Sequence, residues 1–213
     1  MIRHTPFVIT IGRQFGSGGR EIGKALAKRL GIEFYDKRLL EEAARHAGLS
    51  NEIFARHDER YPRFISGLFS FAQGYMPVNT YVPQSPVSGD RVQEALSDFI
   101  RKLAETRSCV IVGRTSDYAL KNHPNVLNIF VHAPQDVCAK RIMERGDAPD
   151  IDRARAMSDK TNRLRAQYYN FYTDKRWGDS ASYDLTFNSS LLPIDQIVEI
   201  IVKYIEMRDA AKE

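Results

Sequence analysis

The most constraining feature of this sequence is a regular alternation between short apolar runs and longer amphipathic segments. The short runs are typical of buried strands, and they cover 7–11, 33–35, 109–112, 126–131 and 183–187. The longer segments have helical spacing, and they cover 21–30, 37–47, 90–106, 134–145, 151–172 and 194–207. A strand followed by a crossover helix and another strand builds a parallel sheet covered on both faces. We therefore predict a three-layer α/β/α fold with a five-stranded parallel sheet.

The length of 213 residues suits one domain, so we treat 1–213 as a single unit. The segment 58–89 interrupts the alternation with four prolines and several aromatic residues: Pro62, Phe64, Phe69, Phe71, Tyr75, Pro77, Tyr81, Pro83 and Pro86. It is too apolar for a disordered linker and too broken for one long helix. We predict that 58–89 is an insert that covers part of the molecule.

The predicted helix over 151–172 has one stripe of side chains that we expect to be buried. Its members recur at intervals of four, three, four and three residues: Met157, Thr161, Leu164, Tyr168 and Phe171. Trp177 follows this helix and, with the neighbouring tyrosines, is a candidate to stack on a nucleotide base.

Charge and cysteine content restrict the classes of function. The net charge of +4 is mildly basic, which suits a polyanionic ligand but does not by itself indicate nucleic-acid binding. Cys109 and Cys138 lie in apolar runs and are too few for a disulfide framework or a zinc cluster. We expect two reduced core thiols and a cytoplasmic protein. No run approaches the ~18 apolar residues of a membrane span, and 1–6 has no apolar signal core.

A glycine-rich segment joins the first predicted strand to the first predicted helix. It reads Gly12-Arg13-Gln14-Phe15-Gly16-Ser17-Gly18-Gly19-Arg20-Glu21. Glycines allow the positive φ angles that point successive amides into one hollow. The N-terminus of the following helix adds unpaired amides and the positive end of its dipole. Four glycines in eight residues favour a phosphate site over the alternative, a tight turn without a ligand.

Two standard nucleotide loops fit this segment incompletely. The dinucleotide fingerprint needs a third glycine where Glu21 stands, although Asp36 has the place of its ribose-binding acid. The Walker pattern needs a lysine where Gly19 stands. Arg13 or Arg20 would then supply the missing cation, since arginine binds phosphate in a bidentate manner.

Further motifs follow in a specific order, and their combination resembles one family. They are Ile11-Gly-Arg-Gln-Phe-Gly-Ser-Gly-Gly-Arg-Glu21, Phe34-Tyr-Asp36, Cys109-Val-Ile-Val-Gly-Arg114, Arg165-Ala-Gln-Tyr-Tyr169, Trp177, Tyr183-Asp-Leu185 and Asn188-Ser-Ser190. Over nearly the whole chain they resemble the cytidylate kinase-like family of nucleoside monophosphate kinases. The resemblance implies a P-loop nucleoside triphosphate hydrolase fold with strand order 2-3-1-4-5. It also implies ATP and Mg²⁺ as cofactors and phosphoryl transfer to a nucleoside monophosphate.

The same resemblance implies a region that binds the monophosphate, a mobile lid and several arginine roles. The insert 58–89 would lie on the side that binds the monophosphate, and 141–155 would be a lid-like segment. Arg114, Arg141 and Arg165 stand where the family's arginines contact phosphates and base. The chain departs from the family pattern at Gly19, Glu21, Val112 and Asn162. Two alternatives therefore stay open, a nucleotide-binding module without catalysis and a kinase for another small molecule.

Basic residues concentrate in the segment 140–176, which holds ten basic and six acidic residues. Phosphoryl transfer depends mainly on cations placed around the moving group. This favours a phosphate clamp over the alternative of a solvated helix face with ion pairs. We expect Arg141 and Arg165 to close over the transferring group, with further candidates in Arg153, Arg155 and Arg163.

The predicted site gathers where strands end, because ligands of parallel sheets bind beyond the carboxyl ends of the strands. We predict four catalytic cations: Arg13, Arg20, Arg141 and Arg165. We assign the donor nucleotide to Gly12, Gln14, Phe15, Gly16, Ser17, Gly18, Gly19 and Glu21, with Ser17 also as the candidate ligand of Mg²⁺. We assign the acceptor to Asp36, Arg114, Arg155 and Arg163.

Two of these residues have structural alternatives, and the partners follow from the predicted function. Asp36 would equally suit an N-cap for the helix that starts at Lys37. Glu21 suits a partner of the helix dipole better than a metal ligand. We expect nucleotide substrates, no membrane and no nucleic acid as partners, and a homo-oligomer is compatible with this interpretation.

Overall fold

The computed structural model describes residues 6–46 and 87–211, and within these ranges the chain forms one five-stranded parallel sheet. The strands run in the order β2-β3-β1-β4-β5, which confirms the predicted order. Their bounds are β1 Val8–Arg13, β2 Glu33–Tyr35, β3 Cys109–Val112, β4 Val126–His132 and β5 Leu185–Asn188. The register pairs Val8 with both Cys109 and Val126, so β1 is the central strand.

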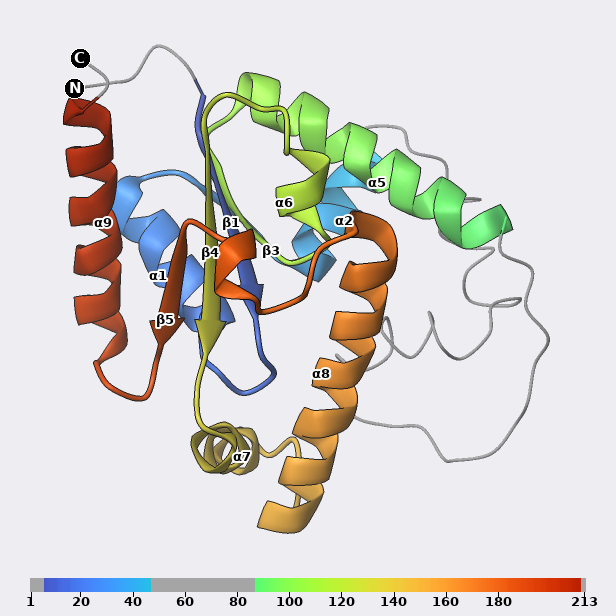
Figure 1. Cartoon of the computed structure of the whole chain (residues 1–213), viewed down its shortest axis with the longest axis vertical. Helices are drawn as coiled ribbons and strands as arrows, with labels where there is room; N and C mark the ends of the chain where they lie inside the picture. Colours follow the sequence, from blue (N-terminus) through green and yellow to red (C-terminus); the bar gives the residue numbers. More distant parts are fainter. Residues whose placement is uncertain (1–5, 47–86, 212–213) are drawn as a thin grey trace.

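Helices cover both faces of the sheet and its carboxyl end. Their bounds are α1 Gly19–Leu30, α2 Lys37–His46, α5 Val87–Thr106, α6 Ser116–Ala119, α7 Gln135–Glu144, α8 Ile151–Thr173 and α9 Ile194–Ala210, with a 3₁₀ turn η1 at Ser180–Ser182. Helices α1 and α9 pack on one face, and α2, α5 and α6 lie on the other (Figure 1). Helix α7 and the start of α8 lie beyond the arrowheads of the strands, and α8 runs from there back to the level of the sheet (Figure 1). The three-layer α/β/α fold is confirmed.

Side-chain alternation in the central strand divides the core into two halves. Ile9 and Ile11 are fully buried in the layer beneath α1 and α9. Val8 points to the opposite face, where it packs with Leu40 and Ile100 of α2 and α5. A strand that is apolar on both faces needs a helix on each side. Because all the strands are parallel, their carboxyl ends lie at one edge of the sheet.

Two predictions about elements need correction. Helix α6 has only four residues, too few for a helical period, and the sequence reading missed it. In α8 the predicted stripe is wrong at its far end, because Phe171 is 74% exposed. The buried side chains are Ala154, Ser158, Thr161, Tyr169 and Thr173, which include Thr161 of the predicted stripe, while its Met157, Leu164 and Tyr168 are half-buried. The C-terminal half of α8 keeps a four-residue interval, which turns the buried face away from Phe171.

The predicted insert 58–89 falls outside the described residues except for 87–89, which open α5. No helix in the described ranges combines the length and apolarity needed to cross a membrane. Cys109 and Cys138 are both buried and form no disulfide, as predicted. Burial raises the pKa of the Cys109 thiol to about 12.

Candidate active site

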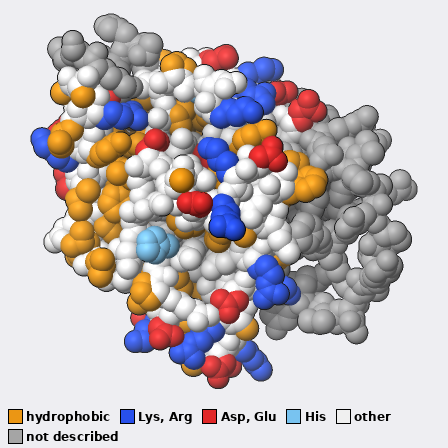
Figure 2. All heavy atoms as spheres, viewed as in Figure 1, with side chains coloured by type: hydrophobic (Ala, Val, Ile, Leu, Met, Phe, Trp, Pro, Cys, Tyr) orange, Lys and Arg blue, Asp and Glu red, His pale blue; other side chains and the backbone are white. Residues whose placement is uncertain are grey.

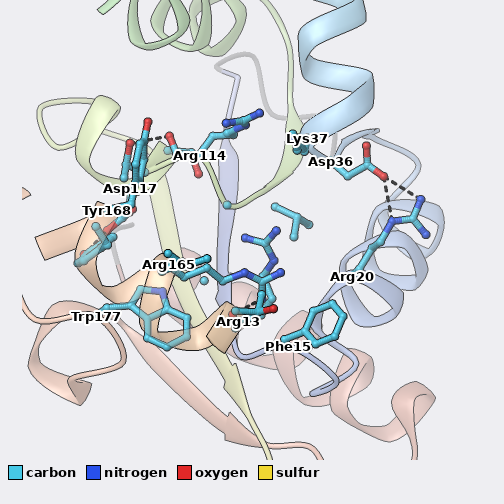
Figure 3. Close-up of a pocket in the computed structure, with 18 of the residues that line it drawn as sticks. Arg13, Phe15, Arg20, Asp36, Lys37, Arg114, Asp117, Arg165, Tyr168 and Trp177 are labelled. Carbon is cyan, nitrogen blue, oxygen red and sulfur yellow. Dashed lines mark hydrogen bonds and ion pairs between the residues drawn. The ribbon is translucent and has the colours of Figure 1, made fainter. Parts of the chain in front are cut away.

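A cavity of about 730 Å³ opens at the carboxyl edge of the sheet, between the glycine loop, α6 and α8. In Figure 3, Arg13 and Arg165 extend into its centre, with Arg20 and Asp36 to one side and Asp117 to the other. Its volume lies in the range of small-molecule sites, about 300–1,000 Å³. Its charged lining residues are Arg13, Arg20, Glu21, Asp36, Lys37, Arg38, Arg114, Asp117, Arg145, Asp147 and Arg165.

The glycine loop runs from the end of β1 into the first turn of α1. Gly16 and Gly18 have φ angles of 82° and 79°, which glycine adopts without strain. A Cβ on Gly16 would lie 2.6 Å from the carbonyl oxygen of Cys138, so the loop passes against α7. Within the described ranges, no acceptor takes a hydrogen bond from the amides of Gly18, Gly19 or Arg20. These amides are therefore available to an oxyanion.

Side chains behind the loop hold it in this shape. The Gln14 side-chain oxygen accepts a hydrogen bond from the Ala133 amide at 3.2 Å. The Phe15 amide donates to the side-chain oxygen of Asn162 at 2.8 Å. Ser17 is fully buried, and its hydroxyl donates to the Gln14 carbonyl at 2.9 Å. Gln14 and Ser17 thus shape the loop from behind, and the placement of Ser17 does not suit a ligand of Mg²⁺ in the cavity.

Arg141 also lies behind the loop rather than over the cavity. Its Nη1 donates to the Ser17 carbonyl at 3.1 Å and to the Ser189 hydroxyl at 2.9 Å. Its Nη2 donates to the Ser189 carbonyl at 2.8 Å. Arg141 does not line the cavity. The prediction that Arg141 closes over the transferring group therefore does not match its position in the structure. It clamps the loop to the turn between β5 and α9.

Arg13 and Arg165 meet at the centre of the cavity without an acidic partner. Nη1 of Arg165 donates to the Arg13 carbonyl at 3.0 Å, and no carboxylate among the described residues pairs with either guanidinium. Burial, followed by the charge of Arg114, lowers the pKa of Arg13 to about 10. Burial, followed by Arg13 and Arg145, lowers the pKa of Arg165. Crowded guanidinium groups of this kind favour the binding of an anion.

Arg20 and Asp36 form an ion pair at one side of the cavity. Nε and Nη2 of Arg20 lie 2.9 and 2.7 Å from Oδ2 of Asp36. The other carboxylate oxygen accepts from the Leu39 amide at 3.0 Å and caps α2. Burial acts to raise the pKa of Asp36, but hydrogen bonds from Leu39 and Arg20 outweigh it, so that pKa is lowered. Asp36 therefore has the capping role and also lines the cavity.

Arg114 reaches the cavity from a left-handed turn after β3. Gly113, Arg114 and Thr115 have φ angles of 81°, 62° and 49°. Left-handed conformations of residues other than glycine cost on the order of 1–3 kcal/mol each. The Ser116 amide, which donates to the Gly113 carbonyl at 3.3 Å, closes the turn, and Gln93 of α5 donates to the Thr115 hydroxyl. Strain maintained by surrounding contacts is typical of functional sites.

Two predicted substrate residues lie away from the cavity. Arg155 pairs with Asp136 at 2.8 Å and with Asp152 at 3.5 Å. Arg163 is exposed on α8, and neither arginine lines the cavity. Figure 2 shows basic and acidic side chains mixed over α7 and the start of α8. The surroundings of Arg155 and Arg163 therefore match the alternative interpretation, a solvated helix face with ion pairs, better than a phosphate clamp.

Sequence reasoning did not select several residues that line the cavity. Asp117 accepts a hydrogen bond from the Tyr169 hydroxyl at 2.6 Å, and burial raises the pKa of Asp117. Arg145 lies 5.4 Å from the centre of the Phe15 ring and 3.8 Å from Glu21. Asp117 follows β3 closely, as Arg114 does, so its place after a buried strand was the available signal.

The sheet order, the loop that enters α1 and the basic cavity at the carboxyl edge define a P-loop kinase, an enzyme that transfers phosphoryl groups. The chain belongs to the cytidylate kinase-like family, whose sequence profile matches residues 8–191.

Two relatives cover almost the whole chain. A cytidylate kinase from Halorubrum lacusprofundi is 23% identical over 207 residues, which are 97% of this chain and 93% of that protein. A cytidylate kinase from Archaeoglobus fulgidus is 25% identical over 209 residues, 94% of this chain and 95% of that protein.

Solved structures agree with the fold. An uncharacterized protein from Eubacterium ventriosum is 29% identical with a TM-score of 0.69, and the match covers 94% of this chain and 98% of that one. A shikimate kinase from Bacteroides thetaiotaomicron has a TM-score of 0.53 at 15% identity, with the same coverage. At that identity the likeness supports the P-loop fold alone.

Proposed function

We propose that this enzyme transfers the γ-phosphoryl group of ATP to a nucleoside monophosphate. The observation that carries the proposal is the pair Arg13 and Arg165 at the centre of the cavity, where no described carboxylate neutralises them. A phosphate chain placed there would meet both guanidinium groups.

The donor phosphates would lie on the N-terminus of α1. The amides of Gly18, Gly19 and Arg20 supply hydrogen-bond donors, and the helix dipole favours negative charge there. Arg13 lies beside these amides, since its Cβ approaches Gly19. This arrangement provides positioning and charge, which are the main requirements of phosphoryl transfer.

The acceptor would occupy the side of the cavity formed by the ends of β2 and β3. Arg114 lines this side from β3, and Asp36 and Lys37 line it from β2. An arginine suits the acceptor's phosphate, and Asp36 offers an acceptor for a ribose hydroxyl. The cytidylate kinase relatives support cytidylate as the first candidate acceptor.

Arg145 links the proposed lid to the donor side. It lies in the segment 141–155, and it approaches both the Phe15 ring and Glu21 of the loop. Closure of this segment over a bound nucleotide would exclude water and bring Arg145 toward the phosphates. Because Arg141 is clamped behind the loop, we place the moving part of the segment after α7.

Magnesium accompanies ATP in kinases, but a resident metal site does not fit the described residues. They hold no group of three or more His, Cys, Asp or Glu side chains arranged for a metal. Arg20 stands at the position of the Walker hydroxyl, and Ser17 is buried. Mg²⁺ fits only as an ion carried on the nucleotide phosphates. The carboxylate of Glu21 lies in the wall of the same cavity.

One observation favours a second candidate, nucleotide binding without turnover. Gly19 stands where the Walker lysine would contact the β- and γ-phosphates. A loop without its cation would still bind phosphate through its amides but would stabilise the transition state less.

A coupled assay of ADP formation tests both candidates. The purified chain is incubated with ATP, Mg²⁺ and one nucleoside monophosphate at a time, and calorimetry measures nucleotide binding in parallel. We expect ADP formation that depends on at least one monophosphate. Binding without turnover for every monophosphate would support the second candidate instead. Turnover only with a sugar or other hydroxyl compound would replace the proposed acceptor.

A further inference from the structure

The loop exchanges the positions of a glycine and a cation relative to the Walker pattern. When the second glycine of G-x-x-x-x-G-K-[ST] is placed on Gly18, the first glycine falls on Arg13 and the lysine on Gly19. This chain therefore has a cation at the pattern's first glycine, and it has a glycine at the pattern's lysine. The two departures are six residues apart in sequence, so only the structure can say whether they are connected.

The structure brings the two positions into contact. Cβ of Arg13 lies 2.6 Å from the place that a Cβ on Gly19 would occupy, and Cγ lies 3.2 Å from it. Any side chain at 19 would displace the stem of Arg13. Gly19 does not have a positive φ angle, so the backbone does not require glycine there. The tightest contacts at 19 therefore come from the Arg13 side chain, and Cβ of Val131 follows at 3.3 Å.

The far end of Arg13 lies on a second glycine. Nη1 and Cζ of Arg13 lie 2.0 and 2.9 Å from the place that a Cβ on Gly113 would occupy. The side chain thus crosses Gly19 and carries its charge from the end of β1 to the end of β3. This path leads along the wall of the cavity, where Gly113 and Arg13 are both lining residues.

We propose that Arg13 is the phosphate-binding cation of this loop in place of the Walker lysine, and that Gly19 is a positioning residue that makes room for it. The inference rests on the proposed function, because it assigns the cation that meets the terminal phosphate of the donor where the donor amides adjoin the acceptor side. A planar guanidinium that arrives from the strand end can bind two phosphate oxygens at once, whereas a lysine at 19 would act as a point charge.

A double-mutant cycle with Arg13→Gly and Gly19→Ala tests the connection. The probe is a non-hydrolysable ATP analogue, and calorimetry measures its affinity for the wild type, each single variant and the double variant. We expect Arg13→Gly to weaken binding about 10- to 100-fold, since it removes a charged donor. Gly19→Ala should weaken binding in the wild-type background and have a much smaller effect in the Arg13→Gly background, where the contact with Val131 at 3.3 Å is the one that is left. Additive effects would overturn the role of Gly19.

Three further variants keep the test decisive. Arg13→Met keeps most of the stem volume without the charge, and it should lose affinity while its unfolding free energy changes little. Lys24→Met removes a charge from the exposed side of α1 and serves as the matched control with unchanged affinity. Arg13→Gly combined with Gly19→Lys rebuilds the Walker pattern and should regain at least part of the affinity that Arg13→Gly alone loses.

The outcomes separate this inference from the proposed function. Wild-type affinity in both Arg13→Gly and Arg13→Met, together with normal turnover, would overturn the inference and leave the kinase intact. Analogue binding that depends on Arg13 without turnover of any monophosphate would support the inference and overturn the proposed reaction. A wild type that does not bind the analogue would overturn both.

Discussion

At the scale of single residues, two arginines on α8 show how position decides their roles. Arg165 lines the cavity and contacts the loop, whereas Arg163, two residues earlier, is exposed and lies outside the cavity. In a helix, residues two apart point in different directions. Residue type alone therefore does not distinguish the two arginines, whereas their positions on the helix give them different surroundings.

We expect Arg165→Ala to lower kcat/KM about 30- to 1,000-fold, because loss of a preorganised charge donor costs roughly 2–4 kcal/mol in the transition state. Arg163→Ala should stay within about twofold of the wild type in the same assay of ADP formation. Similar losses in both variants would contradict the structural placement. Urea unfolding of each variant shows whether the effect of Arg165→Ala is only a loss of stability.

Asp117 gives a prediction about pH. Burial raises its pKa, although Tyr169 and Lys175 act in the other direction. The folded protein therefore holds this proton more tightly than the unfolded chain does. Its contribution to stability is present below the ordinary Asp pKa of about 3.9 and is lost as pH rises through the folded pKa.

Asn cannot ionise, so Asp117→Asn should avoid this loss. We expect the unfolding free energy of the variant, relative to the wild type, to increase between about pH 4 and pH 8. Urea unfolding at the two pH values measures the difference. An equal difference at both would show that Asp117 titrates normally in the folded state.

At the scale of elements, the glycine loop is held by contacts from α7, α8 and the turn after β5. Arg141 makes three of them, to the carbonyls of Ser17 and Ser189 and to the Ser189 hydroxyl. A hydrogen bond to a charged group contributes about 1.5–3 kcal/mol, and bonds that share one guanidinium group do not add independently. A loop that presents amides to phosphate needs this support, because its own backbone bonds are few.

We expect Arg141→Met to lower the unfolding free energy by about 2–3 kcal/mol and to weaken nucleotide binding as the loop loosens. Lys140→Met removes the neighbouring exposed charge and should change stability by less than about 0.5 kcal/mol. Chemical denaturation and calorimetry measure the two effects. Equal stability of both variants would mean that the clamp is not an important contact.

At the scale of the whole molecule, stability comes from the layers between the sheet and its helices. Ile201 of α9 is fully buried against the sheet, while the adjacent Ile200 is 44% exposed. The site lies at one edge of this core and takes little part in it.

We predict that Ile201→Ala lowers the unfolding free energy by about 2–5 kcal/mol, because it leaves a cavity in the layer. Ile200→Ala should change it by less than about 0.5 kcal/mol. Below their melting temperatures both variants should keep the wild-type affinity for nucleotide. A reduced affinity in folded Ile201→Ala would show that this layer also positions the loop.

Much of the fold follows from local patterns in the chain. The strands over 33–35 and 109–112 have the predicted bounds, because short runs of aromatic or β-branched residues between polar turns specify them without help from distant residues. The four-residue α6 has no period to detect, and the buried face of α8 depends on what packs against it. The resemblance to a family supplied the strand order, which no local pattern contains.

The sequence by itself determined the alternation of strands and helices, the place of the glycine loop and the excess of cations in 140–176, because each of these is a property of neighbouring residues. Only the tertiary structure decided which cations face the cavity. Arg13 and Arg165 are 152 residues apart along the chain and meet in space, while Arg141 turns behind the loop and Arg155 pairs with Asp136. The physical reason is that a side chain's partner depends on the packing of distant elements, which residue type and spacing do not record.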